Sequence, residues 1–377
     1  WRQIYEGVQT NENVQRRRFK PYIVSKQKII LSKKLKHIAV FRLSAMGDVA
    51  IIVPIVRAFV NQNKECKITV VSRPFFKPFF ESIDGVDFFA IDLNQKHKGF
   101  IGLIKLFFDL KKLKIDGFAD LHNVLRSKII RTLFAWSGKK VAFTDKGRKE
   151  KKALTRSKNK VFQPVKTMFE RHIETFEKLG FSVNLDQPEF PNLVMSEKTQ
   201  AISGDKNNQK WIGIAPFAQY QSKVYPIDLM QQVIDILAKN SNYQIFLFGG
   251  GKHETEILNS FSTNKKNCIV VAGKLYLSQE LQLISQLDVM VSMDSGNGHI
   301  AAMLGNKVIT LWGATHPFAG FAPFNQPLEF SLTADREKYP LLPTSVYGNK
   351  IVEGYQDAMR SISVESIVNK INSVVNQ

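Results

Sequence analysis

Cysteine is scarce in this chain of 377 residues, which contains only Cys66 and Cys268. The two lie far apart in sequence and form neither a disulfide framework nor the paired spacing of a metal site. Long hydrophobic runs are also missing, because no apolar stretch approaches the length of a membrane-spanning helix. The polar N-terminus lacks the features of a secretory signal. These absences predict a cytoplasmic protein.

Acidic residues are scarce too, but only in one half of the chain. Residues 1–190 hold 38 Lys and Arg against 18 Asp and Glu, whereas residues 191–377 hold 15 of each. The net charge of +20 therefore belongs entirely to the first half. This asymmetry indicates that one domain meets an anionic partner and the other does not. The basic runs at 16–36 and 138–160 predict an extension and a long mobile loop, respectively, although such runs are often only solvated surface.

The chain alternates short apolar strands with helices, which predicts an α/β fold. Predicted strands lie at 37–43, 67–73, 117–122, 210–216, 244–250, 268–273, 288–294 and 307–317, and predicted helices at 49–62, 100–114, 126–138, 226–240, 253–261 and 277–287. Two successive alternating runs predict two doubly wound domains. We expect a basic extension at 1–36, domains at 37–190 and 210–350, a linker at 191–209 and a C-terminal helix at 351–377.

The stretch SMDSGNGHIAAMLG, residues 292–305, places small and polar residues directly before an apolar helical run. A helix start offers unpaired N–H groups and a partial positive charge, so a glycine-bearing turn there lets a phosphate approach the backbone. In a parallel sheet, ligands bind at the carboxyl ends of strands, which is where Asp294 to His299 fall. An ordinary helix cap followed by turn glycines explains these residues equally well.

Each half also has a polar turn after its first strand. In RLSAMGDVA, Gly47 allows close approach, and Asp48 stands at a helix start, where it acts either as a general base or as a cap. In IAPFAQYQSKVYP, Lys223 either neutralises a phosphate or is one more surface lysine. The residues alone leave both choices open.

Four motifs, in this order and spacing, resemble glycosyltransferase family 9, the lipopolysaccharide heptosyltransferases. They are FRLSAMGDVAIIVPIVRAF, IGIAPFAQYQSKVYP, IFLFGGGKHETEI and VSMDSGNGHIAAMLGNKVITLWGATHP. The resemblance implies a GT-B architecture, in which two Rossmann-like domains face a central cleft. The first domain would bind the acceptor sugar and the second the nucleotide sugar. The resemblance further implies an inverting transfer without a metal or a cofactor.

By this resemblance, Asp48 matches the catalytic base and Lys223 the lysine that meets the donor phosphates. The other donor-binding candidates are Gly47, Gly250, Asp294, Ser295, Gly296 and His299, and the acceptor-binding candidates are Arg126 and Arg73. The implied substrates are a nucleotide sugar, ADP-heptose, and the anionic inner core of lipopolysaccharide or lipooligosaccharide. Ile51, Ile52 and Tyr225 depart from the family pattern, so the donor sugar stays open.

Other functions remain compatible with the sequence. A nucleotide-sugar epimerase of the same architecture and a non-catalytic sugar-nucleotide-binding relative are the alternatives. We expect no nucleic-acid partner, because the basic residues are not interleaved with an aromatic platform motif. The helix predicted at 100–114 sets Phe107, Phe108 and Leu110 among lysines, which could suit peripheral contact with anionic lipids of the inner membrane. Packing on its own sheet is the more ordinary role for such a helix.

Overall fold

Two parallel β-sheets organise the computed structural model, which describes residues 35–350 and 352–376. The residues from Leu35 onward form one compact unit. The extension predicted at 1–36 lies almost wholly outside the described residues. Within these residues, no helix is long and apolar enough to cross a membrane. The domain boundaries proposed from the sequence stay a prediction.

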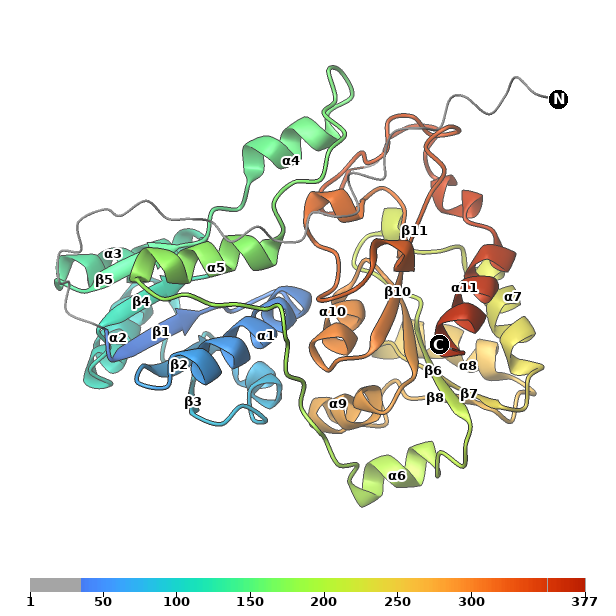
Figure 1. Cartoon of the computed structure of the whole chain (residues 1–377), viewed down its shortest axis with the longest axis horizontal. Coiled ribbons are helices and arrows are strands. Elements are labelled where there is room, and N and C mark those ends of the chain that lie inside the picture. Colours follow the sequence, from blue (N-terminus) through green and yellow to red (C-terminus); the bar gives the residue numbers. More distant parts are fainter. Residues whose placement is uncertain (1–34, 351, 377) are drawn as a thin grey trace. The chain divides into compact units, whose positions relative to one another are not determined.

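The first sheet has the strand order β3-β2-β1-β4-β5 (Figure 1). Its strands are β1 His37–Phe41, β2 Lys67–Ser72, β3 Val86–Ala90, β4 Gly117–Asp120 and β5 Lys140–Phe143, and its helices are α1 Met46–Gln62, α2 Gly99–Lys112, α3 Leu125–Trp136, α4 Arg148–Thr155 and α5 Met168–Leu179. A short 3₁₀ helix, η1, spans Pro74–Phe79. The chain leaves β1 toward one edge of the sheet and leaves β4 toward the other. The loops after these two strands therefore flank a crevice, where α/β sheets bind ligands.

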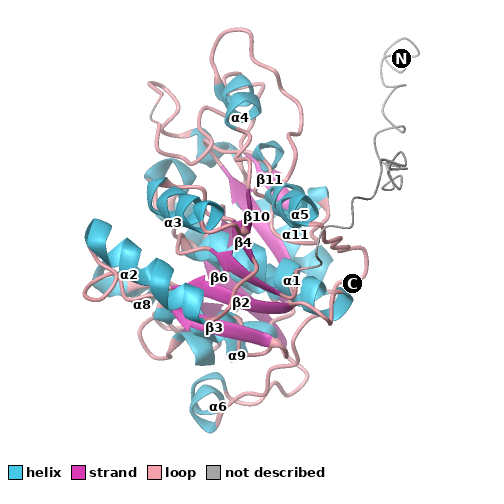
Figure 2. Ribbon diagram, turned by 90° about the vertical axis from the view of Figure 1, so that its left-hand side faces the viewer, coloured by secondary structure: helices cyan, strands magenta, loops and turns pink. Residues whose placement is uncertain are grey.

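Two helix layers cover the first sheet (Figure 2). Ile38, Val40 and Ile68 of the sheet pack with α1 and α5 in one apolar core. Ala39, Phe41 and Phe118 alternate to the opposite face and pack with α2 and α3. This alternation is the period of a strand buried on both faces, as parallel strands usually are.

The second sheet has the order β11-β10-β9-β6-β7-β8. Its strands are β6 Lys210–Ala215, β7 Tyr243–Leu247, β8 Cys268–Val270, β9 Val289–Met293, β10 Lys307–Trp312 and β11 Ser331–Thr333, and its helices are α6 Glu197–Ser203, α7 Ile227–Ala238, α8 Gly251–Ser262, α9 Leu277–Ser285, α10 Gly296–Met303 and α11 Val364–Val375. Four 3₁₀ helices complete it: η2 Gln221–Lys223, η3 Pro317–Ala319, η4 Leu328–Phe330 and η5 Ala358–Ser361. The crevice of this sheet lies between β6 and β9.

One apolar core runs from the first sheet into the second. It contains Ile52 and Val56 of α1, Ile300 and Met303 of α10, and Trp211 of β6. Helices α1 and α10 pack against each other, so the inner helix layers of both sheets share this core. The arrangement brings the carboxyl edges of the two sheets together.

Three sequence predictions differ from the structure. The segment 138–160 is not one long loop, because it contains β5 and α4. The linker predicted at 191–209 contains the helix α6, which begins with Ser196 accepting a hydrogen bond from the Thr199 N–H. The C-terminal helix α11 begins only at Val364, where Ser363 caps it.

Candidate active site

The N-termini of α1 and α10 face each other between the two sheets. A methyl group at Gly47 would come within 2.9 Å of His299 Cδ2 and 3.2 Å of Gly296 Cα. Only glycine allows this approach. The candidate base loop and the candidate donor loop are therefore direct neighbours.

Asp48 occupies the first turn of α1. Its Oδ2 accepts a hydrogen bond from the Ala45 N–H at 3.1 Å and pairs with the Arg42 guanidinium. Arg42 is buried and donates further hydrogen bonds to the Leu121 and Ser44 carbonyls, at 2.6 and 2.9 Å. Burial raises the pKa of Asp48, but Arg42, the Ala45 N–H and nearby histidines outweigh it, so the pKa is lowered. Asp48 is thus an ionised carboxylate that also caps its helix.

A pocket of about 250 Å³ opens beside Asp48. Its lining comes from both halves of the chain: Arg42, Ser44, Ala45, Asp48, His122, Lys146, Lys151, Met168, Phe321 and Tyr347. Three cationic side chains and one carboxylate make this lining positive. An anionic ligand group therefore matches the pocket better than a neutral one.

Lys151 is the most unusual member of the pocket, because its side chain is buried without a carboxylate partner among the described residues. Its Nζ lies 3.3 Å from Met168 Sδ and 3.9 Å from the centre of the Phe321 ring. Burial, and then the neighbouring Arg171, lower the pKa of Lys151 to about 7. An incoming anion would favour the charged form of this amine.

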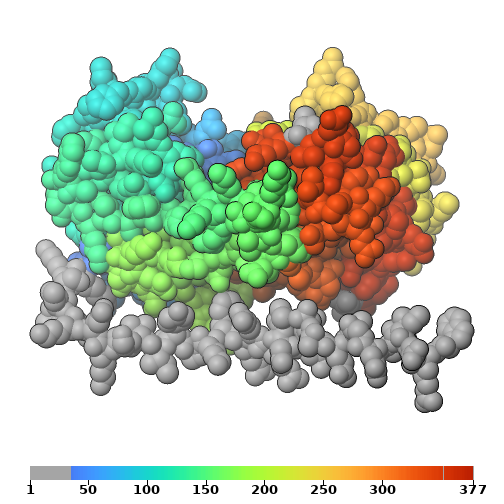
Figure 3. Space-filling model, turned by 90° about the horizontal axis from the view of Figure 1, so that it is seen from above, coloured from blue at the N-terminus to red at the C-terminus, as the bar shows by residue number. Residues whose placement is uncertain are grey.

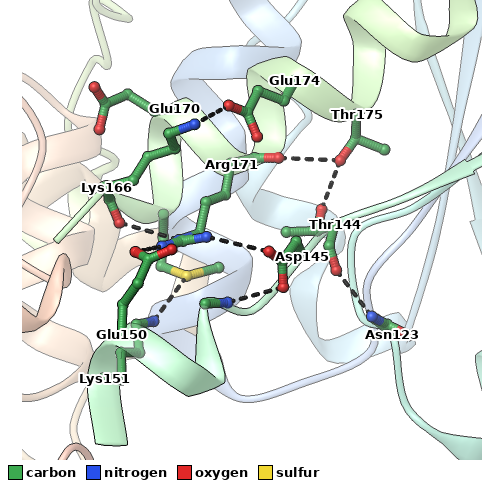
Figure 4. Close-up of polar contacts among 12 residues, drawn as sticks. Asn123, Thr144, Asp145, Glu150, Lys151, Lys166, Glu170, Arg171, Glu174 and Thr175 are labelled. Carbon is green, nitrogen blue, oxygen red and sulfur yellow. Dashed lines mark hydrogen bonds and ion pairs between the residues drawn. The ribbon is translucent and has the colours of Figure 1, made fainter. Parts of the chain in front are cut away.

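Arg171 of α5 holds α4 in place (Figure 4). Its guanidinium pairs with Glu150 at 2.5 Å and with Asp145 at 3.6 Å, and its Nε donates to the Lys166 carbonyl. Gly147, which precedes α4, has a φ of +60°, and a methyl group there would overlap this guanidinium. The network fixes the position of α4 and with it the pocket lysines.

Two histidines beside Asp48 are neutral at physiological pH. Burial, and then Arg42, lower the pKa of both His122 and His172 to about 3. His172 Nδ1 hydrogen-bonds the Thr144 hydroxyl at 2.9 Å, whereas His122 Nδ1 has no partner among the described residues. Being neutral, neither adds positive charge to the pocket.

The second crevice gathers the predicted donor residues. Lys223 Nζ pairs with Asp294 Oδ2 at 3.2 Å, and both side chains are largely buried. Ser295 is the N-cap of α10, and Gly296 is its first residue. His299 is buried, its Nδ1 has no partner among the described residues, and burial lowers its pKa despite Asp294 and Asp48 nearby.

Three predicted residues stand apart from this group. Gly250 caps α8, where its N–H donates to Glu254 Oε2 at 2.7 Å. Arg126 is exposed near the start of α3, and Arg73 is exposed after β2. Neither arginine lines the pocket. Their assignment to the acceptor stays a prediction.

Sequence reasoning missed Arg42, His122, Lys146, Lys151, Phe321 and Tyr347. Arg42 lies inside the quoted motif FRLSAMGD, and Lys146 and Lys151 lie inside the basic run 138–160. The charge of that run is plain in the sequence, but nothing in its pattern shows that Lys151 turns inward. Among the described residues, no three His, Cys, Asp or Glu side chains cluster as metal ligands would.

Comparison with known proteins decides the family. Residues 103–345 match the pattern of glycosyltransferase family 9 (heptosyltransferase). The chain belongs to this family. The glycosyltransferase assignment and the resemblance stated from the motifs are thus confirmed.

Two relatives of similar sequence are lipopolysaccharide heptosyltransferases. The chain is 25% identical over 301 residues to a lipopolysaccharide core heptosyltransferase of Haemophilus influenzae, covering 77% of this chain and 82% of that protein. It is 28% identical over 230 residues to lipopolysaccharide heptosyltransferase 2 of Escherichia coli, covering 56% of this chain and 62% of that protein. The second match spans about three fifths of the relative's length.

Solved structures show the same fold at low identity. A family 9 glycosyltransferase from Veillonella parvula superposes with a TM-score of 0.70 at 18% identity, covering 90% of this chain and 97% of that one. E. coli heptosyltransferase WaaC, solved with ADP, gives 0.61 at 18% identity, covering 90% and 98%. The GT-B architecture predicted from the sequence is therefore confirmed.

Proposed function

We propose that this glycosyltransferase moves a heptose from ADP-heptose to the inner core of lipopolysaccharide or lipooligosaccharide, with inversion at the anomeric carbon. The observation that carries the proposal is the contact between the start of α1, which bears Asp48, and the start of α10, which bears the donor motif. The names of the curated relatives and the ADP bound in a structural relative support the choice of substrates.

The donor diphosphate would bind at the start of α10. The unpaired N–H groups there and the Lys223 ammonium both favour negative charge, which grows on the diphosphate as its bond to the sugar breaks. Asp294 holds Lys223 at the end of the crevice. On donor binding, the lysine would exchange part of this ion pair for a phosphate oxygen.

Asp48 would accept the proton of the acceptor hydroxyl. The hydroxyl oxygen attacks the anomeric carbon from the face opposite the diphosphate, the C–O bond to the diphosphate breaks, and the proton passes to the carboxylate. Because its pKa is lowered, Asp48 is ionised before the reaction but is a weak base, so proton transfer must accompany bond formation. Arg42 keeps the carboxylate in place.

The acceptor would present an anionic group to Lys146 and Lys151. These side chains share the pocket with Asp48, and the pocket lies in the half of the chain with the excess positive charge. Arg126 and Arg73, which lie outside the pocket, would meet more distant anionic groups of the same lipid-linked acceptor. The enzyme would then work at the inner face of the cytoplasmic membrane.

The test is a transfer assay with ADP-heptose and lipopolysaccharide inner core as the substrates. Asp48→Asn keeps an acceptor for the Ala45 N–H but removes the base, so turnover at saturating substrates should fall by about 10²–10⁴-fold. The matched control is Asp92→Asn, because Asp92 also accepts backbone N–H groups but lies outside the pocket. Turnover of Asp48→Asn within about threefold of the parent would overturn the role of the base.

The same assay without acceptor separates the transferase from an epimerase. A transferase should leave ADP-heptose intact apart from slow hydrolysis, whereas an epimerase would interconvert the donor alone. Conversion of the donor to its epimer in the absence of acceptor would contradict the proposal. Binding of ADP without any turnover would instead favour the non-catalytic alternative.

A further inference from the structure

We infer that the outer face formed by α2 and α3 docks the enzyme on a membrane that contains anionic lipids. The two helices pack side by side on the first sheet, away from the shared core (Figure 2). The inference rests on the proposed function in one respect: a lipid-linked acceptor is the reason to expect a membrane next to the enzyme. It concerns a surface outside the pocket.

Large apolar side chains are exposed on this face. On α2 the exposed residues Ile101, Lys105, Phe108 and Lys112 recur at helical spacing, and on α3 Leu125, Lys128, Thr132 and Trp136 do so. The exposed fractions are 70% for Ile101, 54% for Phe108, 77% for Leu125 and 80% for Trp136. Phe107 and Leu110, which the sequence also suggested, are instead buried on the sheet. Each helix thus presents one outward stripe that mixes apolar and cationic residues.

The positive charge of the same face favours an anionic partner. Helices α2 and α3 together carry six Lys and Arg, one Asp and no Glu. The one acid, Asp109, is held by Lys96 and Lys112. Aromatic side chains among lysines suit the interface of an anionic bilayer, where rings sit at headgroup level and ammonium groups meet lipid phosphates. A neutral protein partner would leave these lysines without counter-charges.

The position of the face relative to the pocket fits this role. Leu125 begins α3 three residues after His122, which lines the pocket, and both follow the carboxyl end of β4. A bilayer resting on α2 and α3 would therefore lie near the pocket opening on the first half of the chain. An acceptor sugar anchored by lipid could then reach Asp48 without leaving the membrane.

The test is co-sedimentation of the full chain with vesicles of phosphatidylglycerol and phosphatidylethanolamine, against phosphatidylcholine vesicles. Lys105→Glu with Lys128→Glu, and separately Phe108→Ser with Trp136→Ser, should each weaken binding to the anionic vesicles by about tenfold or more. The matched controls use exposed residues elsewhere: Lys252→Glu with Lys274→Glu, and Val194→Ser with Leu328→Ser. Controls should bind as the parent does.

Trp136 supplies a direct reading of the contact. Of the four tryptophans, Trp211 and Trp312 are buried and Trp1 lies outside the described residues, so the measurement is made with Trp1 replaced by Phe throughout. A blue shift of the emission on adding anionic vesicles should then come from Trp136 and vanish in Trp136→Phe, which keeps an aromatic ring and should still bind. We call the two double variants, Lys105→Glu with Lys128→Glu and Phe108→Ser with Trp136→Ser, the face variants. The inference would be overturned if both face variants bound anionic vesicles as the parent does, or if the blue shift survived in Trp136→Phe. A change in molar mass of the face variants in the absence of vesicles would also overturn it, because it would assign the face to a second copy of the chain.

Transfer to a soluble core oligosaccharide without lipid separates this inference from the proposed function. The face variants should keep the parent rate with that acceptor, because none of the substituted residues lines the pocket. If the proposed function fails, no variant transfers heptose while vesicle binding still depends on the face. If the docking inference fails, transfer is normal, and the face variants bind anionic vesicles as strongly as the parent does.

Discussion

At the scale of single residues, the site depends on charges that are buried without full compensation. Arg42 offsets Asp48, and Asp294 offsets Lys223, but no described carboxylate pairs with Lys151. A buried ammonium group loses hydration, and its neutral form is favoured until an anion arrives. Ligand charge and side-chain protonation should therefore be coupled in this pocket.

Lys151 should make acceptor binding depend on pH. Its pKa of about 7 means that the side chain is mostly charged at pH 6 and mostly neutral at pH 8. If it binds an anionic group of the acceptor, the KM for the acceptor should rise between pH 6 and pH 8 while kcat changes little. Steady-state kinetics across this range measures the effect.

Lys151→Arg serves as the matched test, since an arginine stays charged over the whole range and should flatten the pH profile. Lys152→Met changes an exposed lysine of the same helix and should leave the profile as it is. If the KM of the parent enzyme for the acceptor stays constant from pH 6 to pH 8, the role of Lys151 is contradicted.

Lys223 and Asp294 should both contribute to donor affinity. Lys223→Ala removes a charge-assisted contact to phosphate, worth about 1.5–3 kcal/mol, so the Kd for ADP should rise by roughly 10- to 100-fold. Asp294→Ala frees the lysine but removes the partner that positions it, and we expect a smaller rise. Calorimetric titration with ADP measures both, with Lys266→Ala as control, because Lys266 is exposed and lies outside the four motifs. Unchanged affinity in both site variants would remove this assignment of the donor site.

At the scale of elements, α4 links the pocket to the rest of the fold. Its preceding residue, Gly147, adopts a positive φ that disfavours other residues, and it leaves room for the Arg171 guanidinium. Beyond α4, the Val165 N–H donates to the Phe318 carbonyl and Lys160 Nζ to the Pro343 carbonyl. Figure 3 shows this green segment lying against the orange and red surface of the second half.

Gly147→Ala should displace α4 and impair acceptor binding. Gly138→Ala is the matched control, because Gly138 also has a positive φ but has nothing within 4 Å of the added methyl group. Both variants carry the backbone cost of about 1–2 kcal/mol, and only Gly147→Ala adds the overlap with Arg171. We expect a lower Tm and a higher KM for the acceptor in Gly147→Ala than in Gly138→Ala, with the ADP affinity of both unchanged. Equal KM values in the two variants would show that α4 does not position the pocket.

The elements that the sequence predicted well are those with a strong apolar pattern. Strands β1, β6 and β9 are nearly uniform apolar runs, because both of their faces are buried, and their existence needed no tertiary information. Strand β5, KVAF, is short and half-exposed. Helix α4, RKEKKALT, consists mostly of good helix formers, but it is short and has too few apolar residues to show a helical period. Arg171 and the pocket hold α4 by long-range contacts, which no local pattern records.

At the scale of the whole molecule, the site exists only because the two sheets meet. The sequence predicted both crevices and the residues at their edges, since each motif sits where a parallel strand ends. It could not predict that Phe321 would cover Lys151, since these residues lie 170 positions apart and meet only because the two halves of the chain pack together. Pocket composition is therefore the part of the site that only the structure reveals.

The shared core predicts how the described part of the chain unfolds. A chain of two independent domains should melt in two steps, but α1 and α10 bury Ile52, Ile300 and Trp211 in one core, so opening either half exposes apolar surface of the other. We expect a single transition whose calorimetric and van't Hoff enthalpies agree. The emission of a variant with Trp1, Trp136 and Trp312 replaced by Phe, which reports on buried Trp211, and hydrogen exchange in β1 should follow the same curve. ADP at about 100 times its Kd adds about 2.7 kcal/mol to the free energy of unfolding and should move the whole transition upward. Two resolved transitions, of which ADP moves only the one reported by Trp211, would show that the halves unfold independently and that α1 and α10 contribute little to their cohesion.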